Sequence, residues 1–144
     1  MADVYAACLH EAGHAIAGMA SHVRVTSVWV RGATGMCCYS GRSNALTALA
    51  GPCAEYHLKH PETRPAAESL LRQLANGQRD VVDAVQLLEG RVDGDRLVEV
   101  WLKARELVVD EWPAIVRVAQ ALQRYGRLTA AEVRAVWSSD ARAA

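Results

Sequence analysis

The sequence lacks three features that would point to a charged or membrane partner. Its sixteen basic and sixteen acidic residues cancel, so no strong attraction to nucleic acid or to an anionic membrane is expected. It has no uncharged apolar run near the roughly 20 residues that span a bilayer. It also lacks the basic segment and apolar core of a secretory signal at its N-terminus. These absences favour a cytoplasmic protein with neither a membrane span nor a nucleic-acid partner.

The chain has four cysteines, and their spacing argues against two common uses. Cys8, Cys37, Cys38 and Cys53 include an adjacent pair but no C-x-x-C motif, which is a poor pattern for a disulfide framework or a zinc finger. We interpret the four residues as small buried thiols in a reducing compartment. The apolar share of 51% favours a globular protein over a disordered one.

The order of helix formers, β-branched residues and turns predicts a mainly helical domain with a small β element near the N-terminus, an α+β fold. A length of 144 residues suits a single domain over residues 1–138, with a frayed tail at 139–144. The β-branched segment 23–31 is expected to be a strand, followed by a turn at 32–35 and a short second strand at 36–40. The expected helices span residues 3–20, 44–60, 66–75, 80–89, 95–111, 113–125 and 129–137.

The segment HEAGH places three polar side chains in an alanine-rich helix. His10 and His14 are four residues apart, so both imidazoles project from one face of the helix and can bind one Zn²⁺. Glu11 lies about 100° further round the helix, where its carboxylate can act on a water instead of binding the metal. This is the H-E-x-x-H pattern of zinc peptidases, in which the glutamate is the general base. Two histidines that bind no metal are the alternative.

Two glycines indicate close packing near these side chains. Gly13 lies inside the predicted helix, where glycine costs about 1 kcal/mol relative to alanine, so we expect another segment to approach the helix closely there. The Gly51-Pro52 pair marks either a break in its helix or a similar tight approach between helices.

A catalytic zinc site commonly has three protein ligands, and the third has to come from outside the HEAGH helix. Glu55, Asp80 and Asp83 are the candidates on nearby helical segments. Glu55 could also be the carboxylate that fixes the tautomer of a ligating histidine, and Asp80 could instead cap its helix. The residue pattern alone leaves these alternatives open. The remaining histidines lack the spacing and are interpreted as surface or loop residues: His22, His57 and His60.

Several segments, taken in order, resemble the peptidase domain of the FtsH-type ATP-dependent zinc proteases. They are HEAGHAIAG, VRVTSVWVRG with GMCCY, LAGPCAEYHL, NGQRDVVDAVQLL and the C-terminal ARELVVDEWPAIVRVAQALQRYGRLTAAEVRAV. The resemblance covers most of the chain and implies a zincin-like fold in which His10 and His14 bind zinc and Glu11 is the catalytic base. It also implies that Asp80 is the third ligand, because Asp80 stands at the family's aspartate position. Arg79 departs from the family, which usually has an asparagine there.

The sequence therefore predicts a zinc-dependent metalloendopeptidase that hydrolyses flexible or unfolded polypeptides. The 144 residues hold no ATPase module, so we do not expect this chain alone to unfold proteins, and a separate ATPase or recruiting protein is a further partner to consider. We expect the strand at 24–30 to hold extended substrate by pairing along its edge. The alternatives are a non-catalytic, zinc-containing adaptor or regulatory module and a dedicated processor of one partner protein. Glu11 favours an enzyme, since a structural zinc site does not need a base.

Overall fold

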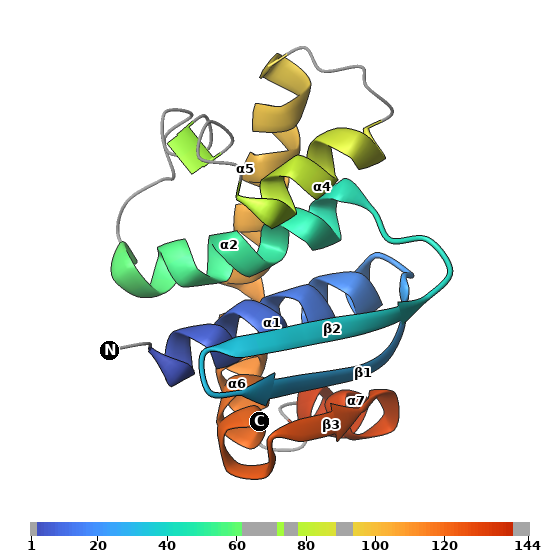
Figure 1. The fold of residues 1–144 in the computed structure, drawn as a ribbon, viewed down its shortest axis with the longest axis vertical. Coiled ribbons are helices and arrows are strands. Elements are labelled where there is room, and N and C mark those ends of the chain that lie inside the picture. The colour runs from blue at the N-terminus through green and yellow to red at the C-terminus, as the bar shows by residue number, and fades with distance from the viewer. Residues whose placement is uncertain (1–2, 62–71, 74–77, 89–93, 140–144) are drawn as a thin grey trace.

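The computed structural model describes residues 3–61, 72–73, 78–88 and 94–139 of the chain (Figure 1). It is mainly helical with a small three-stranded antiparallel sheet, which confirms the predicted fold class at this level. The helix expected at 66–75 lies mostly outside the described residues. The elements follow the order α1 (Val4–Ala20), β1 (Arg24–Arg31), β2 (Thr34–Ser40), α2 (Ala45–Lys59), α4 (Arg79–Leu87), α5 (Gly94–Asp110), α6 (Trp112–Tyr125), β3 (Arg127–Thr129) and α7 (Ala130–Ser138).

Helix α1 runs through the middle of the fold. In Figure 1 it lies behind the β1–β2 hairpin, and it packs against α2 on one side and α6 on the other. Oδ1 of Asp3 caps its first turn by accepting a hydrogen bond from the N–H of Ala6 at 3.1 Å. Small side chains allow the helix to be buried from several sides, at Cys8, Leu9, Ala12, Ala15, Ile16 and Ala17.

Gly13 is the point at which α2 crosses α1. A Cβ on Gly13 would lie 2.7 Å from the carbonyl oxygen of Ala50 and 3.0 Å from Cβ of Ala54. The close approach expected at Gly13 is therefore confirmed, and α2 is the segment that approaches. Helix α2 continues through Gly51-Pro52 without a break, so the interruption read from the sequence is a tight approach as well.

The sheet has β1 at its centre, with β2 on one side and β3 on the other, all antiparallel. The β1–β2 hairpin was expected from the sequence, with a turn that proves shorter than residues 32–35 because β2 already begins at Thr34. Strand β3 was not expected, since its alternation of polar and apolar side chains extends over only three residues, Arg127–Thr129, which is too short to identify a strand.

The unexpected strand corrects one functional expectation. Trp29 of β1 lies opposite Arg127 of β3, and β2 pairs along the other side of β1. The prediction that the strand at 24–30 offers a free edge to substrate is therefore wrong. Among the described residues, the free edge on the hairpin belongs to β2.

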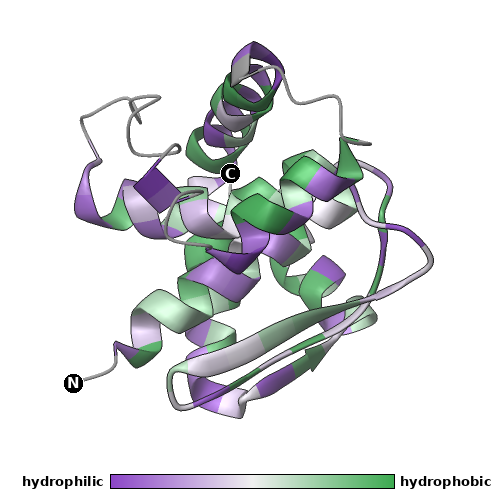
Figure 2. Ribbon diagram, turned by 45° about the horizontal axis from the view of Figure 1, so that its top comes forward, coloured by the Kyte–Doolittle hydropathy of each residue, from purple (hydrophilic) through white to green (hydrophobic). Residues whose placement is uncertain are grey.

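The outer helices close the core with amphipathic faces. Figure 2 shows hydrophobic and hydrophilic residues alternating around α5. Helix α6 ends at Gly126, whose φ is 78°, and α7 opens with a capping box between Thr129 and Glu132, both as expected. The face predicted for α5 is buried or packed against the core throughout, at Leu97, Val100, Trp101, Ala104, Leu107 and Val108.

The interpretation of the cysteines as buried thiols is confirmed for three of the four and is wrong for Cys38. All four are free, with Cys8, Cys37 and Cys53 buried and Cys38 partly exposed. No described helix combines the length and the apolarity that crossing a bilayer needs.

Candidate metal centre

Three side chains from two helices converge on one point. His10 and His14 lie one turn apart on α1, and Asp80 lies in the first turn of α4. Nε2 of His10 is 3.1 Å from Nε2 of His14, and Oδ2 of Asp80 is 2.7 Å and 3.2 Å from these two nitrogens. A tetrahedral Zn²⁺ with ligand bonds of 2.0–2.1 Å holds its ligand atoms about 3.3 Å apart. The three residues expected as ligands are therefore brought together at separations that fit such an ion.

The second ring nitrogen of each histidine is held by an oxygen. Nδ1 of His14 donates to the carbonyl oxygen of Thr47 at 2.7 Å, and Nδ1 of His10 bonds to the carboxylate of Glu55. A carbonyl or carboxylate oxygen can only accept, so each Nδ1 carries the hydrogen and each neutral ring keeps its lone pair on Nε2. Both Nε2 atoms face Asp80, and the neutral form of each ring offers its Nε2 lone pair to a metal at that point.

Gly51 on α2 lies directly against the two rings. A Cβ on Gly51 would lie 2.9 Å from Nε2 of His10 and closer still to Nε2 of His14. Any other residue at this position would place atoms where the two nitrogens meet. The glycine therefore keeps open the space between the histidines.

The structure separates the three carboxylates that the sequence left as alternatives. Asp80 is the one that faces both Nε2 atoms. Glu55 lies on the opposite side of His10, against Nδ1, and so holds the ring from outside. Asp83 is paired instead with Arg79, at 3.8 Å between Oδ2 and Nε. Asp80 is therefore the candidate ligand, and Glu55 is placed to fix the tautomer of His10.

Glu11 lies beside this cluster without being part of it. It is buried, with 6% of its surface exposed, and its Oε1 is 4.0 Å from Nε2 of His14. The hairpin covers its other side at Gly35, where a Cβ would lie 2.9 Å from Oε2 of Glu11. Burial raises the pKa of Glu11 above its ordinary value, although the neighbouring histidines oppose this shift. A raised pKa brings the carboxylate closer to the range in which a general base works well.

In the metal-free cluster, His10 and Asp80 shift each other's pKa. Burial by itself would lower the pKa of His10, but hydrogen bonds to Asp80 and Glu55 outweigh it and raise this pKa to about 10. For Asp80, burial acts to raise the pKa, and the hydrogen bonds to His10 and His14 hold it well below its usual range. At neutral pH, Asp80 is thus an anion that faces a protonated His10. A metal cation would take the place of that proton.

The cluster lies in a cleft that continues on both sides of it. On one side is a cleft of about 750 Å³ with Met36 and Tyr39 of β2 and Leu87 of α4 in its walls. On the other side a hollow of about 310 Å³ extends past His10 and Glu11 to the tip of the hairpin. The edge strand β2 borders both spaces. The two spaces share His10, Glu11 and Gly35 in their walls, so they meet beside the cluster.

The remaining histidines are placed elsewhere. His22 and His60 are exposed, as expected, whereas His57 is half-buried on α2, with its ring 4.5 Å from that of Trp112. Sequence reasoning did not find the carbonyl group of Thr47, because every residue carries the same backbone oxygen and only the fold shows which one meets a histidine.

Comparison with models of known protein families finds no match, and no curated protein matches the chain. The resemblance to the FtsH-type peptidase domain was read from short motifs and their order. It therefore stays a prediction, as do zinc binding and catalysis.

Proposed function

We propose that this protein is a zinc-dependent metalloendopeptidase of the FtsH-peptidase type that hydrolyses flexible or unfolded polypeptides. The observation that carries the proposal is the convergence of His10, His14 and Asp80, with both Nε2 atoms turned inward by bonds to the Nδ1 atoms. Two histidines that bind no metal would not be expected to have an oxygen acceptor at each Nδ1 and a shared carboxylate at both Nε2 atoms.

Each residue has a separate task in this proposal. His10, His14 and Asp80 would hold Zn²⁺, which when bound supplies a Lewis acid that polarises the scissile carbonyl group and acidifies a water. Glu11 takes the proton from the attacking water and passes it to the nitrogen of the departing amine. Its burial favours both transfers, because a carboxylate with a raised pKa accepts and returns a proton more evenly near neutral pH.

The edge strand β2 is the element best placed to hold the substrate. It borders the cleft, and among the described residues it has no strand partner on its outer side. A peptide that pairs with β2 is held by its main chain in an extended form, with little demand on its side chains. A stably folded segment cannot pair in this way, so the proposed substrates are flexible or unfolded.

Metal analysis combined with a protease assay tests the proposal. We expect close to one zinc per chain and hydrolysis of unfolded casein that stops with a chelator and returns when zinc is added. A folded, metal-free protein that takes up no zinc would contradict the proposal. Bound zinc without any hydrolysis would favour the adaptor or regulatory module instead.

A further inference from the structure

The zero net charge of the chain hides a separation of charge along it. Residues 21–54 contain three arginines and no acidic residue, and residues 112–139 contain four arginines and a single glutamate, Glu132. The acidic residues concentrate in the segment between these two stretches. The two basic stretches meet in space, because β3 pairs with β1 and α7 packs against both strands.

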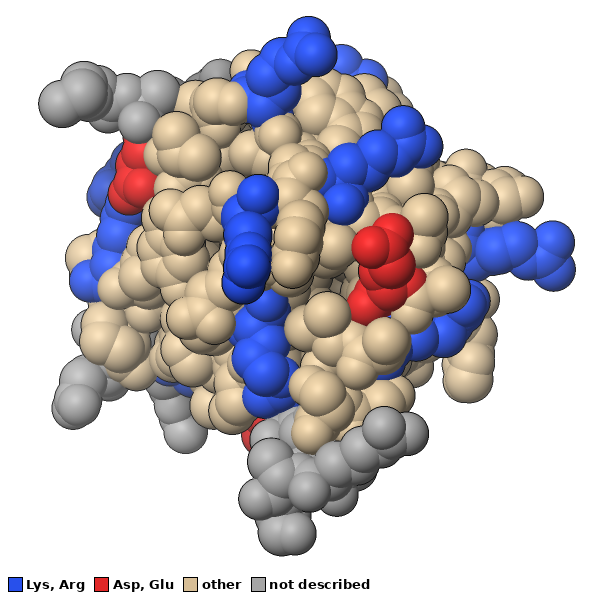
Figure 3. Space-filling view, turned by 90° about the horizontal axis from the view of Figure 1, so that it is seen from below, with Lys and Arg blue, Asp and Glu red and all other residues tan. Residues whose placement is uncertain are grey.

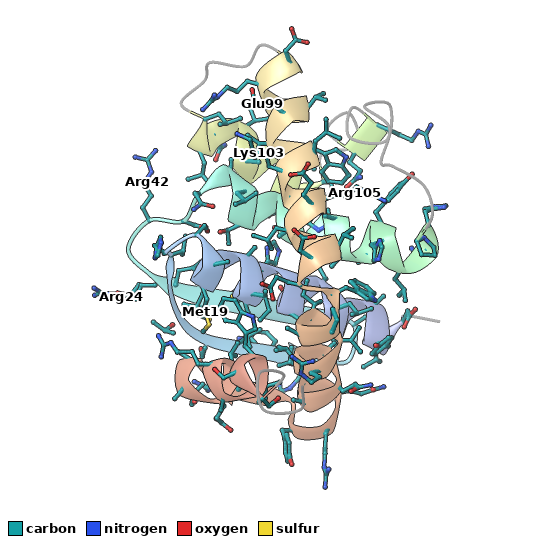
Figure 4. The ribbon with its side chains drawn as sticks, turned by 180° about the vertical axis from the view of Figure 1, so that it is seen from behind. Met19, Arg24, Arg42, Glu99, Lys103 and Arg105 are labelled. Carbon is teal, nitrogen blue, oxygen red and sulfur yellow. The ribbon has the colours of Figure 1, made fainter. Side chains whose placement is uncertain are left out.

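Most of these arginines lie on the surface without a carboxylate partner among the described residues. Among the described residues, five exposed ones have no ion pair with a carboxylate: Arg24, Arg31, Arg124, Arg127 and Arg134. Figure 3 views the molecule from the side of β3 and α7 and shows basic side chains outnumbering acidic ones on this face. Figure 4 shows Arg24 extending away from the fold. These guanidinium groups are therefore available to an anion from outside.

Two of the arginines flank a hollow on the outer face of the sheet. Val28 points into the core, so its neighbour Trp29 lies on the outer face. There Trp29 stands between Arg127 on β3 and Met36 on β2, and Met36 is 53% exposed. We call this feature the arginine hollow, with a volume of about 690 Å³ and a lining of Trp29, Val30, Arg31, Thr34, Gly126 and Arg127.

The arginine hollow adjoins the catalytic cleft at the tip of the hairpin. Thr34, the first residue of β2, lines the arginine hollow and also the smaller space beside His10 and Glu11. A polypeptide that lies in the arginine hollow can therefore continue around the hairpin tip toward Glu11. This continuity links a charged surface to the groups that we assign to peptide hydrolysis.

We propose that the arginine hollow is an exosite that binds an acidic segment of the substrate polypeptide. The proposal rests on the proposed peptidase function. Arg31 and Arg127 each present a planar fork of donors that matches a carboxylate, and the surface of Trp29 and Val30 suits the apolar side chains between acidic residues. Binding at the exosite raises the local concentration of the adjoining chain at the cleft.

An acidic polypeptide fits this surface better than a nucleic acid does. Binding of a nucleic-acid strand draws on many phosphate contacts and on a strongly positive field, and this chain is neutral overall. The arginine hollow offers two arginines around a single tryptophan, which is enough for two carboxylates. Its position beside the hydrolytic groups also favours a peptide.

The direct test is binding of a fluorescent peptide rich in glutamate and leucine by the full-length Glu11→Gln protein, measured by anisotropy. We expect binding that weakens as salt is raised and is lost when glutamine replaces the glutamates. Arg31→Gln and Arg127→Gln should each weaken it about twofold to fivefold. Lys103→Gln is the matched control with no effect, because Lys103 lies on α5, away from β3 and α7 (Figure 4).

Two results would overturn the exosite. One is binding of the acidic peptide that is absent or unchanged in both arginine variants, and the other is tighter binding of single-stranded DNA than of the peptide. Both arginines are exposed, so thermal unfolding of the variants should match that of the parent protein and exclude a folding defect. Arginine-dependent binding without any hydrolysis by the wild type would leave the exosite standing and contradict the peptidase. Hydrolysis at a rate that depends neither on acidic residues in the substrate nor on Arg31 and Arg127 would support the peptidase and contradict the exosite.

Discussion

His14 fills the space that a side chain at Gly51 would need, because a Cβ there would meet the Nε2 and Cε1 atoms of its ring. Helix propensity alone predicts that Gly51→Ala is stabilising, since alanine is favoured over glycine by about 1 kcal/mol inside a helix. We expect the opposite. The added methyl group displaces the ring of His14 and should lower zinc affinity by about tenfold or more, because a ligand that is turned away binds poorly.

Zinc affinity of Gly51→Ala is measured by competition with a chromophoric chelator, and its stability by thermal unfolding with and without zinc. We expect the loss of thermal stability to be largest in the presence of zinc, because weaker binding stabilises the folded state less. Unchanged affinity together with a higher midpoint of unfolding would show that the two histidine rings do not need the glycine.

The three carboxylates near the cluster should differ in their effect on zinc binding. Among the described residues, Asp80 is the one acidic side chain that faces both Nε2 atoms, so we expect Asp80→Asn to cause the largest loss of affinity. Glu55→Gln removes an anion that orients His10, and loss of such a partner typically costs about 10- to 100-fold. Asp83→Asn breaks only an ion pair with Arg79 and is the matched control with almost no effect. A larger loss of zinc affinity for Glu55→Gln than for Asp80→Asn would show that Glu55 is the ligand and that Asp80 only orients a histidine.

Glu11→Gln should abolish hydrolysis while leaving zinc in place. The amide keeps the shape of the side chain but cannot accept a proton, and loss of a general base typically costs about 10²- to 10⁴-fold in rate. Glu106→Gln, an exposed change on α5, is the matched control and should keep full activity. Equal turnover by both variants would show that Glu11 is not the base, and loss of zinc from Glu11→Gln would show that it is a ligand.

Zinc binding should strengthen as pH rises. In the metal-free protein the pKa of His10 is raised to about 10, so at pH 7 its Nε2 carries a proton that the metal has to displace. Affinity should therefore increase by about tenfold per pH unit until this pKa is reached, with release of about one proton per zinc at neutral pH. Calorimetry in buffers of different ionisation enthalpy measures that proton directly. Binding without proton release would show that His10 is neutral before the metal arrives.

The same group contributes to the pH dependence of stability in the metal-free protein above pH 6.5. The pKa of His10 is about 10 in the folded state against an ordinary value of 6.5. The protonated ring thus stabilises the fold fully below about pH 6.5, and this contribution disappears as pH rises through about 10. Chemical unfolding with a chelator present should show this loss, and His10→Gln should remove it.

Local patterns explain which parts of this protein could be predicted from sequence. The spacing of His10 and His14 fixes their shared face on any helix, and Gly126 with Thr129 marks a helix end and a helix start without reference to the rest of the chain. Gly13, as a glycine inside a helix, likewise predicted a close contact with another segment. These inferences need only a few neighbouring residues, and the structure places each of these features accordingly.

The parts that could not be predicted depend on long-range placement. Strand β3 is too short to be identified from its sequence pattern. Because β3 pairs with β1, the free edge of the hairpin is on β2 and not on β1, where we expected it. The separate positions of Asp80 and Glu55 around His10 follow from how α2 packs on α1 and how α4 packs on α2, which no spacing in the sequence encodes. The arginine hollow could not be predicted either, because it also depends on long-range placement. A net charge of zero does not indicate where charged side chains cluster in the fold.

The last prediction concerns the folding state of the substrate. Pairing with β2 needs an extended chain, so a folded protein is cut only while the target segment is locally open. For a substrate of about 5 kcal/mol stability, the unfolded fraction is on the order of 10⁻⁴, and the rate of hydrolysis should fall by a similar factor relative to the unfolded chain. A series of point variants of one substrate protein, graded in stability, tests this relationship. Each loss of about 1.4 kcal/mol in substrate stability should raise the rate about tenfold until the unfolded limit is reached. A rate that is independent of substrate stability would show that this chain recognises a native loop, and it would contradict main-chain pairing with β2 as the mode of binding.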